Sequence, residues 1–177
     1  PGQGEVKTRL ARSVGAALAR DFYRLCLECL REDLDWMERH SSLEAVICPF
    51  SGEDVEWCRQ FWGGHPVIPQ PPGDLGARLN AVDQALRRRG FEVTILIGSD
   101  APTLPPTYLL QCVGGLSRAE AILGPTEDGG FYALASRRLL PTLEGIHWSA
   151  ATTCAEVRQR LVHRGFRRQP AGVRQGD

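Results

Sequence analysis

The stretch VTILIGSD, residues 93–100, contains the clearest strand pattern in the chain. Residues 93–98 show no alternation of polar and apolar side chains, which is typical of a strand that is buried on both faces. We therefore expect this segment to form the centre of a sheet. A polar loop begins at Ser99 and Asp100, directly after the strand. Open α/β sheets bind their ligands at the carboxyl ends of their strands, so this loop is a candidate binding site.

Helices and further strands are expected on both sides of this segment. Apolar residues at helical spacing predict helices over residues 8–39 (one long helix or two joined ones), 53–62, 75–89, 107–116 and 150–163. Short apolar runs predict strands over residues 43–50, 65–69, 119–124 and 130–136. This alternation of helices and strands indicates an α/β protein with three layers, α/β/α, and a mostly parallel sheet.

Composition and charge narrow the class of protein. A chain of 177 residues is close to the usual size of one domain. The 21 basic and 21 acidic residues balance, so there is no uniform positive field for a nucleic-acid polymer, although a local cluster could bind a small anion. No apolar run reaches the length of a membrane span, and the first residues lack a signal-peptide pattern, which predicts a cytoplasmic location.

The six cysteines do not form a recognisable metal or disulfide pattern. Cys26 and Cys29 are spaced as C-x-x-C, but no second pair stands at a spacing typical of zinc sites. Most of the cysteines lie within apolar helical or strand patterns, where a free thiol behaves as a small hydrophobic side chain. We therefore expect buried free thiols.

Two segments have the character of anion sites at the start of helices. The opening segment, PGQGEVKTRL, places Lys7 and Arg9 beside glycines just ahead of a helix, although a solvated terminus would show the same residues. The second segment, GDLGARL, combines Gly73, a capping-type Asp74, and Arg78 in the first helical turn. Backbone amides and an arginine could together bind a phosphate or a base there.

Carboxylates follow two of the predicted strands. Asp100 could hold a hard cation such as Mg²⁺, which takes one or two carboxylates and completes its shell with water and phosphate oxygens. Its alternative role is that of a helix cap or turn residue. Glu127 and Asp128 precede Gly129 and Gly130, where the glycines permit close approach of a ligand, but Asp-Gly is also the commonest hairpin signal.

A third short segment precedes the last predicted helix. Trp148 and Ser149 stand there, after His147. They could contact a substrate, or Ser149 could be only the helix N-cap and Trp148 only an apolar plug.

Taken together and in this order, these motifs resemble those of a bacterial family. The motifs are PGQGEVKTRL (1–10), GDLGARL (73–79), GSDAPTL (98–104), GPTEDGGFYAL (124–134) and HWS (147–149). From Pro1 to about Leu161 the chain resembles the small bacterial glycosyltransferases of the GT-A class, sometimes called selenodomain-associated transferases. These are related in fold to guanylyl- and cytidylyltransferases. The resemblance implies a nucleotide-diphospho-sugar transferase (GT-A-like) fold.

The resemblance also implies roles for individual residues. Lys7 and Arg9 would match the phosphate-binding loop, and Asp100 the aspartate that binds the metal. Asp128, Gly129 and Gly130 would lie on the acceptor or sugar side of the cleft. On this basis Gly73, Asp74, Arg78 and Ser99 are expected on the nucleotide side, and Glu127, Trp148 and Ser149 on the substrate side.

The chain departs from that family at both ends. Family members begin with an apolar strand before the phosphate loop, whereas this sequence begins inside the loop. They also usually end with an acidic motif, for which only Asp177 stands here. The expectation is therefore a single domain, 1–177, that lacks the first strand and the C-terminal end. A vacant place beside strand 93–98 and a missing second metal ligand would follow.

The mechanism implied is group transfer from a nucleotide. Mg²⁺ or Mn²⁺ held by Asp100 would neutralise the diphosphate, Lys7 and Arg9 would clamp it, and Asp128 or Glu127 would act as the base. The acidic segment 124–134 contains no basic residue, which favours a neutral hydroxyl-bearing acceptor unless Arg137 or Arg138 folds over it. The expected partners are a nucleotide sugar and a small-molecule acceptor.

Two alternatives stay open. One is a nucleotidyltransferase, which uses a nucleoside triphosphate and releases pyrophosphate. The other is a nucleotide-binding protein without catalysis. The sequence does not predict the oligomeric state.

Overall fold

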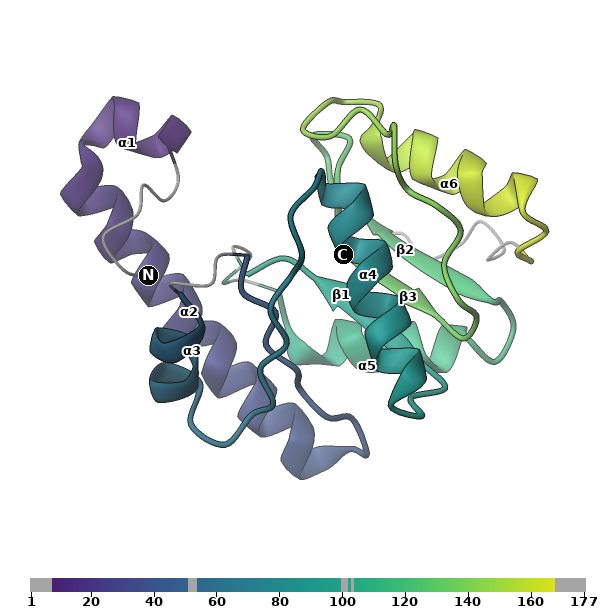
Figure 1. Ribbon diagram of the computed structural model, residues 1–177, viewed down its shortest axis with the longest axis horizontal. Coiled ribbons are helices and arrows are strands. Elements are labelled where there is room, and N and C mark those ends of the chain that lie inside the picture. The colour runs from purple at the N-terminus through teal and green to yellow at the C-terminus, as the bar shows by residue number, and fades with distance from the viewer. Residues whose placement is uncertain (1–7, 51–53, 100–101, 103, 168–177) are drawn as a thin grey trace. The chain divides into compact units, whose positions relative to one another are not determined.

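The computed structural model describes residues 8–50, 54–99, 102 and 104–167, and its helices and strands are labelled in Figure 1. The chain divides into two units. The first unit comprises Pro1–Pro72 and Gly98–Pro106, and the second comprises Gly73–Ile97 and Thr107–Asp177.

Helices dominate the first unit. Its elements are α1 (Thr8–Val14), α2 (Ala16–His40) and α3 (Asp54–Trp62). The helical pattern over 8–39 is thus two joined helices, because Gly15 interrupts it with φ 88°, a conformation that glycine adopts readily. Helices α2 and α3 are connected by Arg31, whose guanidinium donates to the carbonyl of Phe61 at 3.1 Å and lies 5.0 Å from the centre of that ring.

The two strands expected in this unit are reduced to one bridge. Ile47 and Val67 pair in parallel, and the amide of Ile47 donates to the carbonyl of Pro66 at 2.9 Å. Pro49, Pro66 and Pro69 have no N–H group to continue a ladder of hydrogen bonds. The predictions of full strands over 43–50 and 65–69 were therefore wrong in extent.

A three-stranded sheet forms the centre of the second unit. Its strands are β1 (Thr94–Ile97), β2 (Ala121–Pro125) and β3 (Phe131–Ser136), in the order β1-β3-β2. Both pairs are antiparallel, with Thr94 opposite Ser136 and Ala121 opposite the same residue. The predicted mostly parallel sheet is not what the described strands form, since a tight turn joins β2 to β3 and such a turn permits only antiparallel pairing.

Strand β1 lies at the edge of this sheet. It pairs with β3 along one side, and no described strand pairs with its other side. The central position expected for residues 93–98 belongs to β3 among the described strands. Exposure along β1 alternates between buried and half-buried residues, so the absence of polar alternation in the sequence did not mean equal burial on both faces.

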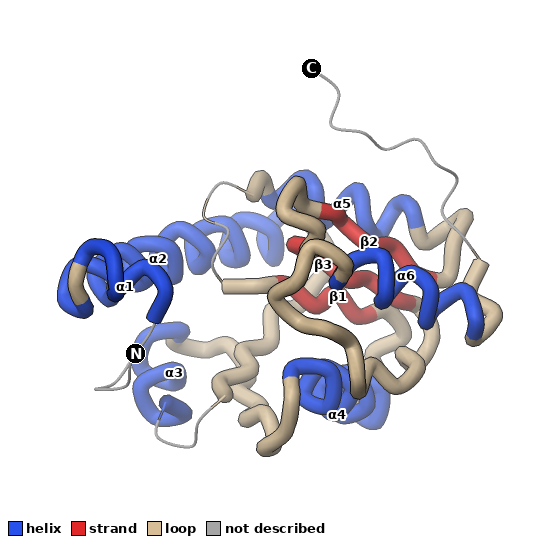
Figure 2. The backbone as a smooth tube through the Cα atoms, turned by 90° about the horizontal axis from the view of Figure 1, so that it is seen from above, coloured by secondary structure: helices blue, strands red, loops and turns tan. Residues whose placement is uncertain are grey.

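Helices cover both faces of the sheet, as Figure 2 shows for α4 (Leu75–Arg88) and α5 (Pro106–Gly115). Helix α5 contributes Cys112 to an apolar cluster that includes Ile122, Ala133 and Ala135. Helix α4 reaches the other face through Asp83, which meets Thr94. Helix α6 (Thr153–His163) lies beside β2. The predicted α/β class and its three layers are thus present in this unit.

Asp83 forms the main polar contact beneath the sheet. Its side chain is fully buried, and its carboxylate accepts hydrogen bonds from the Thr94 hydroxyl at 2.7 Å and from the Leu140 amide at 2.8 Å. Nε of Arg87 lies 3.3 Å from the same carboxylate. These contacts join α4, β1 and the segment that follows β3.

All six cysteines are free thiols, but the prediction that they are buried holds for only four of them. Cys26, Cys58, Cys112 and Cys154 are buried, whereas Cys29 is exposed and Cys48 is half-buried. The C-x-x-C pair therefore forms no disulfide, and its two members have different environments.

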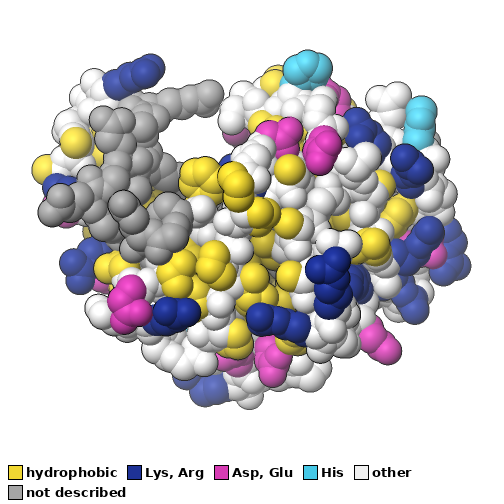
Figure 3. Space-filling view, viewed as in Figure 1, with side chains coloured by type: hydrophobic (Ala, Val, Ile, Leu, Met, Phe, Trp, Pro, Cys, Tyr) yellow, Lys and Arg dark blue, Asp and Glu magenta, His cyan; other side chains and the backbone are white. Residues whose placement is uncertain are grey.

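On the face that Figure 3 shows, basic and acidic side chains are intermixed. Within the described ranges, no helix combines the length and the apolar character needed to cross a membrane.

Candidate functional site

The turn between β2 and β3, residues 126–130, brings together the acidic residues predicted to face a substrate. The Thr126 hydroxyl donates to Oδ1 of Asp128 at 2.6 Å, and the Gly130 amide donates to the same atom at 3.1 Å. These hydrogen bonds lower the pKa of Asp128, with the Thr126 hydroxyl as the main cause. Asp128 is therefore ionised at neutral pH, and the hydroxyl of Thr126 and the amide of Gly130 both bind its Oδ1. Glu127 lies beside it and is exposed.

Gly129 fixes the position of this turn against the start of α6. Its φ is 83°, and a Cβ built on it would lie 2.0 Å from the carbonyl oxygen of Ala151. The amide of Cys154 donates to the Gly129 carbonyl at 2.8 Å. The glycine is thus required both by the turn conformation and by the close approach of a second backbone segment.

Trp148 and Ser149 belong to that second segment. The Trp148 ring packs edge-on to Phe131, the first residue of β3, with 6.3 Å between ring centres. Its Nε1 is buried and has no hydrogen-bond partner among the described residues. Ser149 is exposed with φ 59°, and it is not the N-cap of α6, a position that Thr152 occupies. A ligand would reach the indole nitrogen only after the ring moves, so Trp148 supports the turn from within.

His147 and Glu156 form a pair that sequence reasoning missed. The Glu156 carboxylate accepts hydrogen bonds from the Thr152 hydroxyl at 2.7 Å and from the His147 amide at 3.0 Å, and Nδ1 of the His147 ring lies 3.1 Å away. These interactions lower the pKa of Glu156 to about 2, with the Thr152 hydroxyl as the largest cause. The carboxylate holds the segment before α6 in place.

This pair predicts how stability responds to pH. A lowered carboxylate pKa stabilises the fold fully above the ordinary value of 4.5, and the stabilisation is lost as pH falls toward 2. We expect Glu156→Gln to lower Tm at pH 7, and the difference in Tm between the two proteins to shrink steadily below pH 4.5. Thermal unfolding followed by circular dichroism between pH 7 and pH 3 would measure it. A difference that stays constant over this range would contradict the prediction.

The glycine-containing loop at the start of α4 makes local hydrogen bonds in the described geometry. Oδ1 of Asp74 accepts a hydrogen bond from the Ala77 amide at 2.7 Å, which is the usual geometry of an N-cap. Nε of Arg78 donates to the Asp74 carbonyl at 3.3 Å. Gly73 has φ 136°, and Gly76 lies so close to Leu143 that a Cβ would be 2.1 Å from its carbonyl oxygen. Their expected place on the nucleotide side stays a prediction.

The remaining predicted site residues lie in the first unit. Ser99 shares a hydrogen bond of 2.8 Å with the hydroxyl of Tyr23. Lys7 and Asp100 fall outside the described residues, and Arg9 is described only as a backbone position in α1. The expectations for the phosphate clamp and for the metal ligand therefore stay predictions.

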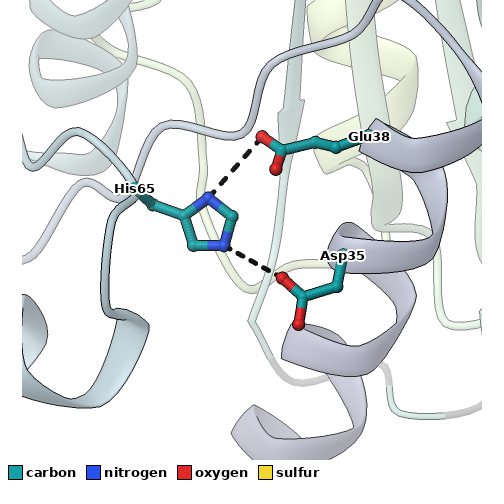
Figure 4. Close-up of side chains that lie close together, drawn as sticks. All are labelled: Asp35, Glu38 and His65. Atoms are coloured by element: carbon teal, nitrogen blue, oxygen red, sulfur yellow. Dashed lines mark ion pairs between the residues drawn. The ribbon is translucent and has the colours of Figure 1, made fainter.

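A different set of residues in the first unit has the chemistry of a metal site. Asp35, Glu38 and His65 each offer one possible ligand atom, and these atoms all lie within 4.8 Å of one another. Figure 4 shows the imidazole between the two carboxylates. No sequence motif predicted this group, because two acidic residues on a helix and a histidine far from them in sequence are common in proteins.

Comparison with known proteins places this geometry in a class. The fold is similar to that of a protein from Desulfovibrio desulfuricans G20, whose crystal structure is described as that of a "putative nucleotide-diphospho-sugar transferase". The TM-score is 0.80 at 25% sequence identity, and the match covers 94% of this chain and 72% of the other. The chain thus has the fold of that class, which confirms the resemblance seen in the sequence.

The family itself is shown by the sequence. Residues 34–150 match the family model DUF2064, which is described as an uncharacterised protein conserved in bacteria. The chain belongs to this family. Among curated proteins, nothing matches the chain.

Proposed function

We propose that this chain is a metal-dependent glycosyltransferase that moves a sugar from a nucleotide-sugar donor to a small hydroxyl-bearing acceptor. Two things support the proposal: the similarity to the Desulfovibrio protein, and the acidic turn at Asp128. The turn is the observation that favours a neutral, hydroxyl-bearing acceptor.

Within the described part of the chain, no arginine or lysine forms an ion pair with Asp128 or lowers its pKa. Asp128 is ionised, and its lowered pKa is caused by hydrogen bonds rather than by an arginine or lysine. A second anion, such as the phosphate of an acceptor, would be repelled there without a cation to offset it. A neutral hydroxyl group would instead find a hydrogen-bond acceptor.

Arg137 and Arg138, which the sequence offered as possible cations for this turn, make contacts elsewhere. Arg137 donates to the carbonyl of Leu116, and Arg138 pairs with Glu120 at 2.9 Å and lies 4.5 Å from the centre of the Phe166 ring. Both follow Ser136, at the opposite end of β3 from Gly130. Since a strand rises about 3.3 Å per residue, the length of β3 separates them from the turn.

In this mechanism the acceptor hydroxyl lies against Asp128. The acceptor oxygen forms a bond to the anomeric carbon as the bond from that carbon to the diphosphate breaks, and the nucleoside diphosphate leaves. The hydroxyl proton passes to Oδ2 of Asp128. Because its pKa is low, the carboxylate takes the proton late, when bond formation has made the hydroxyl acidic. Glu127, Gly129, Gly130 and Ser149 would line the approach of the sugar and the acceptor, with Trp148 packed behind Phe131.

The donor side of the reaction rests on Lys7, Arg9 and Asp100. A carboxylate oxygen is a ligand type that Mg²⁺ and Mn²⁺ prefer, so Asp100 suits such an ion. The bound ion would offset the charge of the leaving diphosphate. Lys7 and Arg9 would hold the phosphates, with Gly73, Asp74, Arg78 and Ser99 toward the nucleoside.

An assay of products tests the proposal. The full chain would be incubated with radiolabelled nucleotide sugars or nucleoside triphosphates, with and without Mg²⁺ or Mn²⁺, over a panel of small alcohols and sugars. We expect a nucleoside diphosphate to be released from at least one nucleotide sugar only when both the ion and an acceptor are present. Release of pyrophosphate from a triphosphate, with no diphosphate from any nucleotide sugar, would instead identify a nucleotidyltransferase.

A further inference from the structure

The group Asp35, Glu38 and His65 in the first unit has features of a metal site. Asp35 and Glu38 stand three residues apart on α2, so their side chains share one face of that helix. His65 follows the end of α3, after Gly63 and Gly64. Figure 4 shows each carboxylate opposite a different nitrogen of the His65 ring. Nε2 lies 3.4 Å from Oδ1 of Asp35, and Nδ1 lies 3.5 Å from Oε1 of Glu38.

These separations are too long for the hydrogen bonds that a buried imidazole normally makes. An N–H···O bond has its heavy atoms about 2.7–3.2 Å apart. The His65 side chain is only 8% exposed, and neither ring nitrogen has a hydrogen bond to any described residue. A cation bound between Nε2 and Oδ1 of Asp35 would give each of these two atoms a closer partner than they have in one another.

A zinc ion fits the spacing. Zn²⁺ binds nitrogen and oxygen ligands at about 2.0–2.2 Å with tetrahedral angles, which places two of its ligands about 3.4 Å from each other. Nε2 of His65 and Oδ1 of Asp35 have this separation. Mixed imidazole and carboxylate ligands suit zinc, whereas Mg²⁺ and Ca²⁺ prefer oxygen alone. We propose that His65, through Nε2, and Asp35 bind Zn²⁺.

Glu38 has a different role in this proposal because it lies at the other nitrogen. A carboxylate near Nδ1 favours the proton on that atom, which leaves the lone pair of Nε2 for the ion. Glu38 is itself held in place, since its Oε1 accepts a hydrogen bond from the Ala45 amide at 2.6 Å. Glu38 is therefore a positioning residue. The Asp35 side chain is 44% exposed, so water can complete the coordination shell.

Such an ion would connect α2 to the segment that follows α3 within the first unit. It would thus stabilise the folded unit by mass action, in proportion to its concentration relative to Kd. This site is independent of the proposed transferase activity, which assigns Mg²⁺ or Mn²⁺ to Asp100.

Isothermal titration of the full chain with ZnCl₂ tests the proposal, after removal of metal and in excess MgCl₂ to occupy sites that prefer oxygen ligands. We expect one equivalent to bind to His65 and Asp35. His65→Gln and Asp35→Asn should each weaken Kd at this site at least about 100-fold, and Glu38→Gln about 10- to 100-fold. Glu32→Gln is the matched control, because it removes an equal charge one turn earlier on α2 and should leave Kd unchanged. Co²⁺ titration should give the visible absorption of a tetrahedral site, lost in His65→Gln.

The proposal is overturned if zinc does not bind, or if Kd stays within about threefold of the parent value in both His65→Gln and Asp35→Asn. Circular dichroism would check that each variant folds. If His65→Gln does not fold, Asp35→Asn decides the outcome, because Asp35 is the more exposed of the two side chains.

Discussion

Replacing Asp128 with asparagine is expected to lower kcat for glycosyl transfer by about 100- to 10,000-fold, the range found when a general base is removed. Asparagine can still accept hydrogen bonds from the Thr126 hydroxyl and the Gly130 amide, so the turn should keep its shape. It carries no negative charge and cannot take the proton of the acceptor. The KM for the donor should change little, since the donor contacts are assigned to other residues. Release of nucleoside diphosphate under saturating substrate measures the effect.

Glu144→Gln is a suitable control for that experiment. Glu144 is exposed and lies in the same unit. Among the described residues, its hydrogen bonds use its backbone N–H and C=O groups and not its carboxylate. Its loss should leave kcat near the parent value. A kcat of Asp128→Asn within threefold of the parent would show that Asp128 does not take the proton.

Replacing Asp83 with alanine is expected to lower the free energy of unfolding by about 3–5 kcal/mol. The substitution leaves the Leu140 amide and the Thr94 hydroxyl without their buried partner, and it leaves Arg87 without its counter-charge. Burial without a partner is destabilising for each of these groups. Urea denaturation, with unfolding followed by circular dichroism, measures the change through the midpoint and slope.

Asp74→Ala gives a comparison within the same helix. Asp74 is exposed and caps the start of α4, so its loss should cost only about 1 kcal/mol. If Asp83→Ala destabilised the protein no more than Asp74→Ala, the buried carboxylate would not have the structural role that its contacts indicate.

The fold could be predicted where local pattern and final structure agree. The pattern over 75–89 gives α4 (Leu75–Arg88), and the pattern over 130–136 gives β3 (Phe131–Ser136). The direction of each strand was harder to predict, because an apolar run does not indicate which other strand it pairs with. The Asp128-Gly129 signal pointed to a hairpin, and a hairpin makes β2 and β3 antiparallel.

The candidate site was predicted in part for a similar reason. The acidic turn at 126–130 is one continuous segment, so its carboxylates and glycines could be predicted from the sequence alone. Asp74 illustrates the limit, since its N-cap geometry and a phosphate loop look alike in sequence. The pair His147 and Glu156, and the group around His65, depend on contacts between separate segments that no local pattern contains.

The strand order β1-β3-β2 also determines when each strand can be paired during synthesis. β1 leaves the ribosome before β2 and β3, but its partner β3 ends at Ser136, roughly 40 residues later, which takes a few seconds at usual translation rates. β2 and β3 can close their hairpin at once, because only a short turn separates them. The newly made chain therefore carries β1 without its strand partner until β3 emerges and takes it into the sheet.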